Sequence, residues 1–255
     1  MKLVVLKSLS NNPYWNLAAE ELAFSKLKKN SNTIILYLWV NSSSVIIGRN
    51  QNPYIECKLD LMERDRVYLV RRKTGGGAVY QDDGNLNYTI IGHEPYADKN
   101  KWNKIICNAI DSLGFESCIS GRNDFLVGGR KVSGSAYMND DNTFLQHGTM
   151  LVNVRLDALK LYLTPQVSKL SKHGIQSVEQ RVNNLSSLNS TISICDVGGA
   201  IEKAMKEAYS NCEVIYYSID DYLNESEISK LAKEYSSKEF LFSDFTLNHV
   251  SDDEL

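Results

Sequence analysis

Apolar residues in this chain occur in short runs separated by turn residues, and this feature narrows the possible folds more than any other. The longest conspicuous run, residues 34–40, has the length of a strand and is far shorter than the ~20 residues of a membrane-spanning helix. The run near the N-terminus, residues 3–6, is too short for the core of a signal peptide. We therefore expect a protein of short strands and helices, with no membrane partner.

Composition supports a large folded core. Of 255 residues, 43% are hydrophobic and 23% are charged, which suits one large domain or two modest ones. The net charge of −3 argues against a general nucleic-acid partner. The five cysteines contain no C-x-x-C pair, so we expect a reducing compartment and a cytoplasmic location. They are Cys57, Cys107, Cys118, Cys195 and Cys212.

Strand-like segments are spread over the first two thirds of the chain. Residues 2–8 and 33–40 are rich in branched and aromatic residues and flank a predicted helix over residues 14–29, which gives a β-α-β start. Further runs, separated by turns such as Gly128-Gly129, predict hairpins of a mixed sheet. These runs cover residues 67–71, 86–92, 125–127, 131–138 and 143–154.

Two helices are predicted by apolar periodicity. Apolar residues from Trp102 to Leu113 recur on one helical face, and Gly114 ends the pattern. The same spacing returns over residues 197–208, with Asp196 as the expected N-cap. After Asn224 the chain becomes polar and contains one more predicted helix.

Three cations directly precede three glycines in the run Arg71-Arg72-Lys73-Thr74-Gly75-Gly76-Gly77-Ala78-Val79. Glycines let backbone N–H groups surround phosphate oxygens, and arginine binds phosphate with two parallel hydrogen bonds. The run matches neither the P-loop nor the dinucleotide pattern. It is therefore either a phosphate cradle or a flexible turn beside a basic edge. The next segment, Asp82-Asp83-Gly84-Asn85, is either a plain turn or brings Asn85 to the same cleft.

A second polar segment begins at Gly121-Arg122-Asn123-Asp124 and continues into a predicted strand. Strand alternation places Lys131, Ser133, Ser135 and Tyr137 on one face, with Val132, Ala136 and Met138 on the other. The polar face either meets solvent or lines a cleft that uses the acceptor Asp124 and the donor Lys131.

His147 interrupts an apolar strand and is either a structural residue or a site residue. The adjacent Gly148 marks either a bulge or the close approach of a ligand. The other histidines have no metal-site spacing, so no resident zinc or iron is expected. Cys118 is either an inert thiol or a nucleophile.

Taken in order, these segments resemble the lipoate–protein ligase family over nearly the whole chain. The matching blocks are Asn12-Pro13-Tyr14-Trp15-Asn16-Leu17-Ala18-Ala19-Glu20, Val45-Ile46-Ile47-Gly48-Arg49-Asn50-Gln51-Asn52-Pro53, the glycine run, Gly121-Arg122-Asn123-Asp124, Arg130-Lys131-Val132-Ser133-Gly134-Ser135-Ala136-Tyr137 and His147-Gly148-Thr149-Met150-Leu151.

The resemblance implies an α+β fold of mixed, mostly antiparallel sheets flanked by helices, as in the biotin/lipoate protein ligase catalytic domain. It also implies a ligase that activates lipoate with ATP and Mg²⁺ to lipoyl-adenylate and pyrophosphate. The acyl group would then pass to a lysine on a lipoyl carrier domain of the 2-oxoacid dehydrogenase complexes or on the glycine-cleavage H-protein.

The resemblance assigns roles to individual residues. Lys131 would be catalytic and would span the lipoate carboxylate and the α-phosphate. The adenylate and acyl chain would be held by Arg72, Gly75, Gly76, Gly77, Ala78, Val79, Tyr80, Asn85, Asn123, Asp124 and His147. Asp124 is also the candidate to hold Mg²⁺ through a substrate phosphate. Gln81 stands where the family often has a histidine, so any role of that histidine is carried by Gln81 or is lost.

Familiar bacterial family members continue into a small accessory domain. We expect residues 1–245 to form the catalytic domain, residues 246–255 to be a polar tail, and the accessory domain to be absent. The chain would then be a catalytic-domain form, or be completed by a separate accessory polypeptide, or perform part of the reaction.

Three other functions remain open at this point. A lipoyl or octanoyl transferase would move the acyl group through a cysteine thioester without ATP. A biotin–protein ligase is disfavoured because its Gly-Arg-rich signature is missing. A non-catalytic carrier-binding module would not need Lys131 or the triple glycine.

Overall fold

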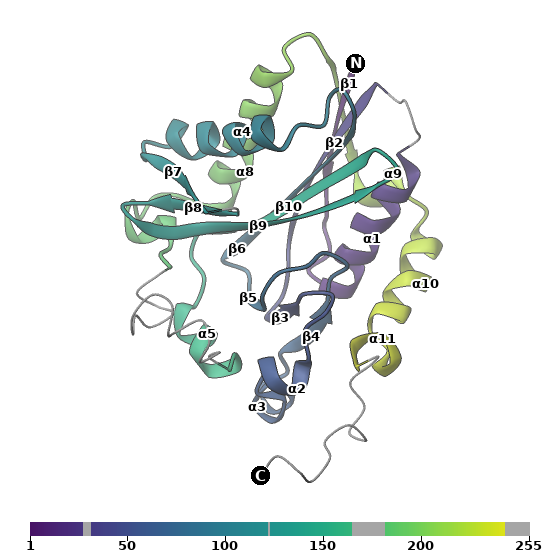
Figure 1. The fold of residues 1–255 in the computed structure, drawn as a ribbon, viewed down its shortest axis with the longest axis vertical. Helices are drawn as coiled ribbons and strands as arrows, with labels where there is room; N and C mark the ends of the chain where they lie inside the picture. The colour runs from purple at the N-terminus through teal and green to yellow at the C-terminus, as the bar shows by residue number, and fades with distance from the viewer. Residues whose placement is uncertain (28–31, 122, 165–181, 243–255) are drawn as a thin grey trace.

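The structure is a computed structural model that describes residues 1–27, 32–121, 123–164 and 182–242. It begins with strand β1 (Lys2–Lys7), helix α1 (Pro13–Lys26) and strand β2 (Thr33–Val40). Strands β1 and β2 pair in parallel, which confirms the predicted β-α-β start (Figure 1). Helix α1 starts at Pro13 because the Asn12 side chain accepts from the Tyr14 N–H and so caps the first turn.

The large sheet has eight strands in the order β11-β1-β2-β6-β10-β9-β8-β7. From β2 to β7 in this order, every neighbouring pair of strands is antiparallel. Its other strands are β6 (Asn85–His93), β7 (Ser117–Ser120), β8 (Asp124–Val127), β9 (Arg130–Asp140), β10 (Thr143–Leu151) and β11 (Glu213–Ser218). A small sheet, β4-β3-β5, contains β3 (Ser44–Ile47), β4 (Tyr68–Arg71) and β5 (Val79–Gln81). The predicted α+β class of mostly antiparallel sheets is confirmed.

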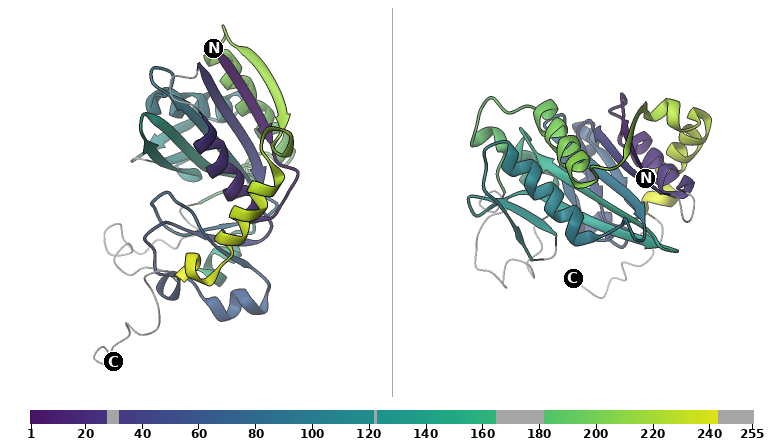
Figure 2. Two further views of the ribbon diagram at one scale, coloured as in Figure 1. Left: turned by 90° about the vertical axis from the view of Figure 1, so that its right-hand side faces the viewer. Right: turned by 90° about the horizontal axis from the view of Figure 1, so that it is seen from above.

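Helices cover both faces of the large sheet, as Figure 2 shows. Helices α4 (Lys99–Ser112) and α8 (Ile194–Ala208) pack on one face, and α1 and α10 (Glu225–Tyr235) pack on the other. The remaining helices are α2 (Pro53–Glu56), α3 (Leu59–Arg64), α5 (Leu156–Tyr162), the 3₁₀ helix η1 (Leu185–Ser187), α9 (Ile219–Tyr222) and α11 (Lys238–Phe242). Within the described ranges, no helix has the length and apolar character to cross a bilayer.

The start of α8 corrects one sequence prediction. Ser193, not Asp196, is the N-cap, and the Ser193 hydroxyl accepts from the Asp196 N–H. The Asp196 carboxylate in turn accepts from the Ser193 N–H, so the two residues form a capping box. The apolar pattern concealed this because residues 194–196 already lie within the helix.

A β-bulge in β9 corrects a second prediction. Phe125 of β8 pairs with Ser133, but the next residue, Leu126, pairs with Lys131, so Val132 is the extra residue. The Lys131 side chain therefore lies over Gly134, where its Nζ is 2.7 Å from the place of a Cβ. The prediction that Lys131 shares a face with Ser133, Ser135 and Tyr137 is wrong, because strict alternation does not allow for the bulge.

Candidate functional site

A cavity of about 180 Å³ is lined by residues from both sheets and from α1. The strand register gives it a direction. Trp39 pairs with Asn87, Asn87 with Thr149, Thr149 with Gly134, and Gly134 with Asp124. Directly opposed residues point to the same face, so this row runs across four strand spacings of about 4.8 Å, or ~19 Å. It leads from an aromatic side chain at one end to a carboxylate at the other.

Lys131 and Asp124 form an ion pair at the charged end of this row. The Lys131 Nζ lies 2.7 Å from the Asp124 Oδ1, and both side chains are partly exposed. The Asn183 N–H donates to the Lys131 carbonyl, so the backbone at the bulge is also held from outside the sheet. The pair is accessible to solvent and lines the cavity. An anionic ligand can therefore replace the Asp124 carboxylate as the partner of the Lys131 ammonium group.

Arg72 shapes the glycine loop, defined as residues 74–78. Its Nη2 donates to the carbonyls of Gly75 and Gly77, both at 2.8 Å. Its Nη1 donates to the Ile46 carbonyl. Burial lowers the pKa of Arg72 to about 10, so the guanidinium stays charged at neutral pH. The Gly75 carbonyl and the Gly76 N–H belong to one trans peptide group and point in opposite directions. Because Arg72 binds the Gly75 carbonyl, the Gly76 N–H points away from Arg72.

The two cations beside Arg72 bind elsewhere. Arg71 donates to backbone carbonyls of distant segments, including that of Leu241. The Lys73 Nζ pairs with the Glu21 Oε1 at 2.5 Å. Of these three cations, Arg72 is the one that lines the cavity. The structure therefore does not group all three around one phosphate.

His147 lies at the centre of a buried hydrogen-bonded relay. Its Nδ1 is 2.9 Å from the Glu20 Oε1, and its Nε2 is 2.8 Å from the Thr74 Oγ1. The Thr74 oxygen also accepts from the Arg72 Nε–H at 3.1 Å. All four side chains are less than 9% exposed. The relay links α1, β10 and the glycine loop.

Buried amides form a second network beside the cavity. The Gln81 Oε1 accepts from the Asn41 Nδ2, and the Gln81 Nε2 donates to the Asn87 Oδ1 at 2.9 Å. Asn85 lies behind them, fully buried, and donates from Nδ2 to the Asn87 Oδ1. Gln81 thus fixes the position of a cavity-lining amide, Asn87, as well as lining the cavity itself.

The structure brings most of the predicted site residues together, but not all of them. The cavity is lined by Arg72, Gly76, Gly77, Val79, Asn123, Asp124, Lys131 and His147. Gly75, Ala78, Tyr80 and Asn85 are outside this lining; Tyr80 stacks on Tyr162 instead. Arg122 of the matching block is outside the described residues. Sequence reasoning missed Leu17, Trp39, Ile46, Asn87 and Thr149, although period-two alternation from His147 already points to Thr149.

Three ambiguous segments are resolved by their surroundings. The Asp82 carboxylate accepts from the Gly84 and Arg155 N–H groups, so the segment at residues 82–85 is a structured turn. The site for a Cβ on Gly148 is filled by the Tyr88 ring, 2.4 Å away, and the strand pairing is regular at this residue, so Gly148 marks close packing and not a bulge, while it also lines the cavity. Cys118 is exposed on β7 and is not part of the cavity lining.

The fold and the site define a class: an α+β protein with a glycine loop and a lysine–aspartate pair around one cavity. Residues 12–206 match the family profile described as the lipoyl protein ligase A/B catalytic domain. The chain belongs to this family. The prediction made from the ordered sequence blocks is confirmed.

Two curated relatives are named lipoate-protein ligase A. The protein of Psychrobacter cryohalolentis is 43% identical over 230 residues, which are 90% of this chain and 67% of that protein. The protein of Blochmanniella floridana is 43% identical over 194 residues, which are 74% of this chain and 57% of that protein. The chain thus matches a little over half to two thirds of the length of these relatives.

Solved structures with the same fold include three ligases. Plasmodium falciparum LipL1 in complex with lipoate has a TM-score of 0.79 and 30% identity, covering 95% of this chain and 74% of that one. A bi-partite lipoate protein ligase from Thermoplasma acidophilum, studied with its E2 lipoyl domain, has a TM-score of 0.79 and 25% identity, covering 100% and 98%. A lipoate-protein ligase A bound with ATP has a TM-score of 0.77 and 26% identity, covering 94% and 97%.

Proposed function

We propose that the chain is an ATP-dependent lipoate–protein ligase that forms lipoyl-adenylate and transfers the lipoyl group to a carrier lysine. One observation carries the proposal. The row from Trp39 to Asp124 joins an aromatic end of the cavity to the Lys131–Asp124 pair, beside the glycine loop. An acid with an apolar tail and an activated carboxylate needs these two ends. The similar proteins that bind lipoate and ATP support this assignment.

The substrates have complementary positions along the row. The apolar tail of lipoate would lie among Leu17, Trp39 and Ile46, and its carboxylate would reach the Lys131 ammonium group. The glycine loop would bind phosphate oxygens through its N–H groups, because the contact with Arg72 leaves the Gly76 N–H pointing away from Arg72. Binding would break the contact between Lys131 and Asp124 that exists in the free protein.

Lys131 would act in both steps. In the first, a carboxylate oxygen of lipoate attacks the α-phosphorus of ATP, a P–O bond forms, and pyrophosphate leaves. In the second, the amine of the carrier lysine attacks the acyl carbonyl, a C–N bond forms, the amine loses a proton, and AMP leaves. Negative charge develops next to the same oxygen atoms in both steps, and a fixed ammonium group stabilises it.

Asp124 suits a role in holding Mg²⁺ together with a substrate. Magnesium ions in nucleotide sites commonly use one or two carboxylates plus phosphate oxygens and water. The Asp124 carboxylate faces the cavity and is 43% exposed, so an oxygen can be offered there. Within the described part of the chain, no cluster of three or more His, Cys, Asp or Glu side chains could hold a metal. A bound Mg²⁺ ion would neutralise part of the negative charge of the phosphates.

The partners in this proposal are lipoyl carrier domains of 2-oxoacid dehydrogenase complexes and the glycine-cleavage H-protein. A separate accessory polypeptide is a further proposed partner, supported by the bi-partite ligase among the similar structures. We place the reaction in the cytoplasm, because all five cysteines are free.

The decisive test is pyrophosphate release from ATP, with and without lipoate. The wild-type protein should release pyrophosphate in a lipoate-dependent manner, and Lys131→Ala should be slower by about 100-fold or more with an unchanged unfolding temperature. Lys131→Arg, which keeps the charge, should retain part of the activity. Near-normal release by Lys131→Ala, or none by the wild type, would contradict the proposal.

A matched arm tests the thioester alternative. Cys118→Ser should transfer lipoate to a carrier domain at the wild-type rate, because Cys118 is exposed on β7 and outside the cavity lining. Transfer that persists without ATP but is lost in Cys118→Ser would identify a transferase instead.

A further inference from the structure

Helix α11, the last helix of the described residues, is bound to β4 through Arg71. This residue ends β4 and is 4% exposed. Its guanidinium Nε donates to the carbonyls of Phe240 and Leu241, both at 3.2 Å. These are the last carbonyls of a helix, which lack partners within the helix, so a cation there is favoured.

The same guanidinium also holds the turn at residues 48–51. Its Nη1 donates to the carbonyls of Arg49 at 2.9 Å and Gln51 at 2.8 Å, and more weakly to that of Gly48 at 3.3 Å. One buried cation therefore joins two segments that are nearly 200 residues apart in the sequence. Hydrogen bonds from a charged donor are stronger than those between neutral groups, so this junction is firm.

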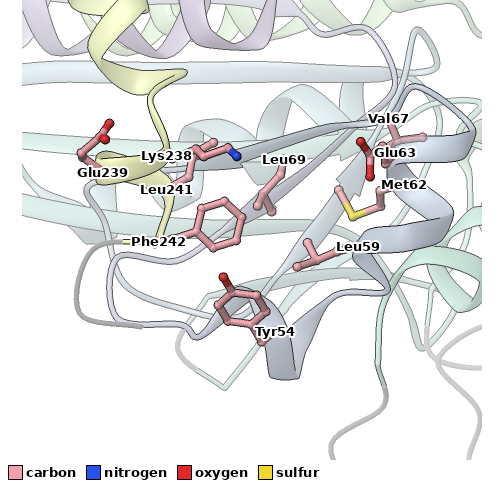
Figure 3. A pocket seen from close by; sticks show the side chains of 10 residues that line it. All are labelled: Tyr54, Leu59, Met62, Glu63, Val67, Leu69, Lys238, Glu239, Leu241 and Phe242. Carbon is pink, nitrogen blue, oxygen red and sulfur yellow. The ribbon is translucent and has the colours of Figure 1, made fainter. Parts of the chain in front are cut away.

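Side-chain packing leaves a cavity beside α11. It has a volume of about 610 Å³ and is lined by residues of α11, α3 and β4, and Figure 3 shows the Phe242 ring between Leu69 and Tyr54. The Phe242 and Tyr54 ring centroids are 5.3 Å apart. The carbonyl contacts with Arg71 therefore add to the packing of Leu241 and Phe240 in holding α11 in place.

The turn at residues 48–51 in turn supports the glycine loop. A Cβ on Gly48 would lie 2.2 Å from the Gly76 carbonyl oxygen, so the two backbones are in direct contact. The Arg49 N–H donates to the Thr74 carbonyl at 2.9 Å. A shift of this turn must therefore move the glycine loop.

A second link runs through α10. The Tyr235 hydroxyl donates to the Glu21 Oε2 at 2.6 Å, and the Glu21 Oε1 pairs with Lys73 at 2.5 Å. Lys73 directly precedes the glycine loop. Helices α10 and α11 thus both contact cations that lie next to the glycine loop, Lys73 through Glu21 and Arg71 directly.

We propose that Arg71 is a positioning residue for the nucleotide step: through it, the seating of α11 sets the shape of the glycine loop. This inference rests on the proposed function for its catalytic meaning. Lipoate binding should be affected less, because Trp39 and Leu17 belong to β2 and α1 rather than to the loop. The coupling therefore predicts a change in the KM for ATP without a comparable change in the KM for lipoate.

The test compares steady-state pyrophosphate release by the wild type and Arg71→Met. The KM for ATP should rise on the order of tenfold, and the KM for lipoate should change by less than about twofold, since small misplacements of a loop weaken the contacts it makes. Arg71→Lys should recover part of the loss. The control is Arg64→Met on α3, whose side chain is exposed and pairs with its neighbour Asp65; it should match the wild type.

A second variant keeps the test decisive if Arg71→Met does not fold. Phe242→Ala loosens α11 at the cavity edge without removing any acceptor of Arg71, and it should raise the KM for ATP in the same selective way. Hydrogen exchange of residues 74–79 should also be faster in both variants. An unchanged KM for ATP, or equal rises for ATP and lipoate, would overturn the inference. A wild type that releases no pyrophosphate would instead contradict the proposed function, and the exchange rates would still decide the coupling.

Discussion

At the scale of single residues, His147 connects α1 to the glycine loop. The Glu20 carboxylate accepts from the His147 Nδ1–H. The His147 Nε2 lies 2.8 Å from the Thr74 Oγ1, which accepts from the Arg72 Nε–H. The Thr89 hydroxyl also donates to Glu20. The relay thus holds the glycine loop at a defined distance from α1.

Thr74→Val tests the relay with a substitution of nearly the same shape. It removes the hydrogen-bond partner of the His147 Nε2, which remains buried, while the Arg72 Nε keeps its contact with the Gly75 carbonyl at 3.3 Å. One buried group is left unsatisfied, which costs about 1–3 kcal/mol, so the free energy of unfolding should fall by that amount. Urea unfolding measures it, and Thr74→Ser, which keeps the hydroxyl, should stay near the wild type. Equal stability of the valine and serine variants would refute this account.

Sequence reasoning identified Lys131 together with its partner Asp124, and it identified His147 without its partners. His147 and Glu20 are separated by 127 positions, and no local pattern relates them. Thr74 was visible inside the glycine run, but its contact with His147 depends on the packing of the small sheet against the large one. Residue identities were readable because they recur in ordered blocks, while the pairings arise from tertiary structure.

At the scale of elements, strand β9 shows where sequence patterns stop being sufficient. Its position was predictable from alternation and from the turn at Gly128-Gly129, which have φ values of +56° and +75°, although the predicted run of residues 131–138 is shorter than the strand Arg130–Asp140. The bulge at Val132 was not, because one additional residue leaves composition and hydrophobicity unchanged. Yet the bulge is what directs Lys131 into the cavity.

Two glycine substitutions should separate the proposed catalytic role of Lys131 on β9 from the packing of Gly148 against Tyr88. In Gly134→Ala, the new Cβ meets the Lys131 Nζ at 2.7 Å, and a flexible side chain can move away. Activity should fall while stability changes little. In Gly148→Ala, the new Cβ meets the buried Tyr88 ring at 2.4 Å, so overpacking should cost about 1–3 kcal/mol. Thermal unfolding and pyrophosphate release measured on both variants check this, and a reversed pattern would contradict the assigned roles of the two faces.

At the scale of the whole molecule, the two faces of the large sheet have different tasks. The cavity and its relay occupy the face toward α1, while the opposite face packs against α4 and α8. There the Trp102 Nε1–H donates to the Tyr209 hydroxyl at 2.9 Å, and that hydroxyl donates to the Tyr96 carbonyl. Sequence periodicity predicted both helices of this layer. It could not predict that β11 is the edge strand beside β1, because that pairing joins residues 2–7 to residues 213–218.

Buried tyrosines give the whole molecule a predictable response to alkaline pH. Burial raises the pKa of Tyr14, Tyr37, Tyr88, Tyr137, Tyr162, Tyr209, Tyr222 and Tyr235, with that of Tyr209 at about 12. An unfolded tyrosine has a pKa of about 10, so between pH 10 and 12 the folded protein binds more protons than the unfolded chain. Stability is therefore complete below about pH 10 and is lost as the pH rises.

The size of this loss can be estimated from the most buried groups. At about pH 11, each tyrosine whose pKa is raised in this way lowers the free energy of unfolding by roughly 1 kcal/mol, so Tyr37, Tyr88, Tyr209 and Tyr235 together lower it by several kcal/mol. Arg72 acts in the opposite direction. Burial of its charged form destabilises the folded protein, and because its pKa is lowered to about 10, this destabilisation decreases above pH 10. The gain from this one group offsets roughly the loss from one tyrosine. The net loss is a large fraction of the 5–15 kcal/mol typical of a folded domain. Urea midpoints measured from neutral pH to about pH 11 should fall as tyrosinate absorbance appears, and they should fall less steeply in Tyr209→Phe. A midpoint that stays constant over this range would show that the tyrosines are not protected as the fold requires.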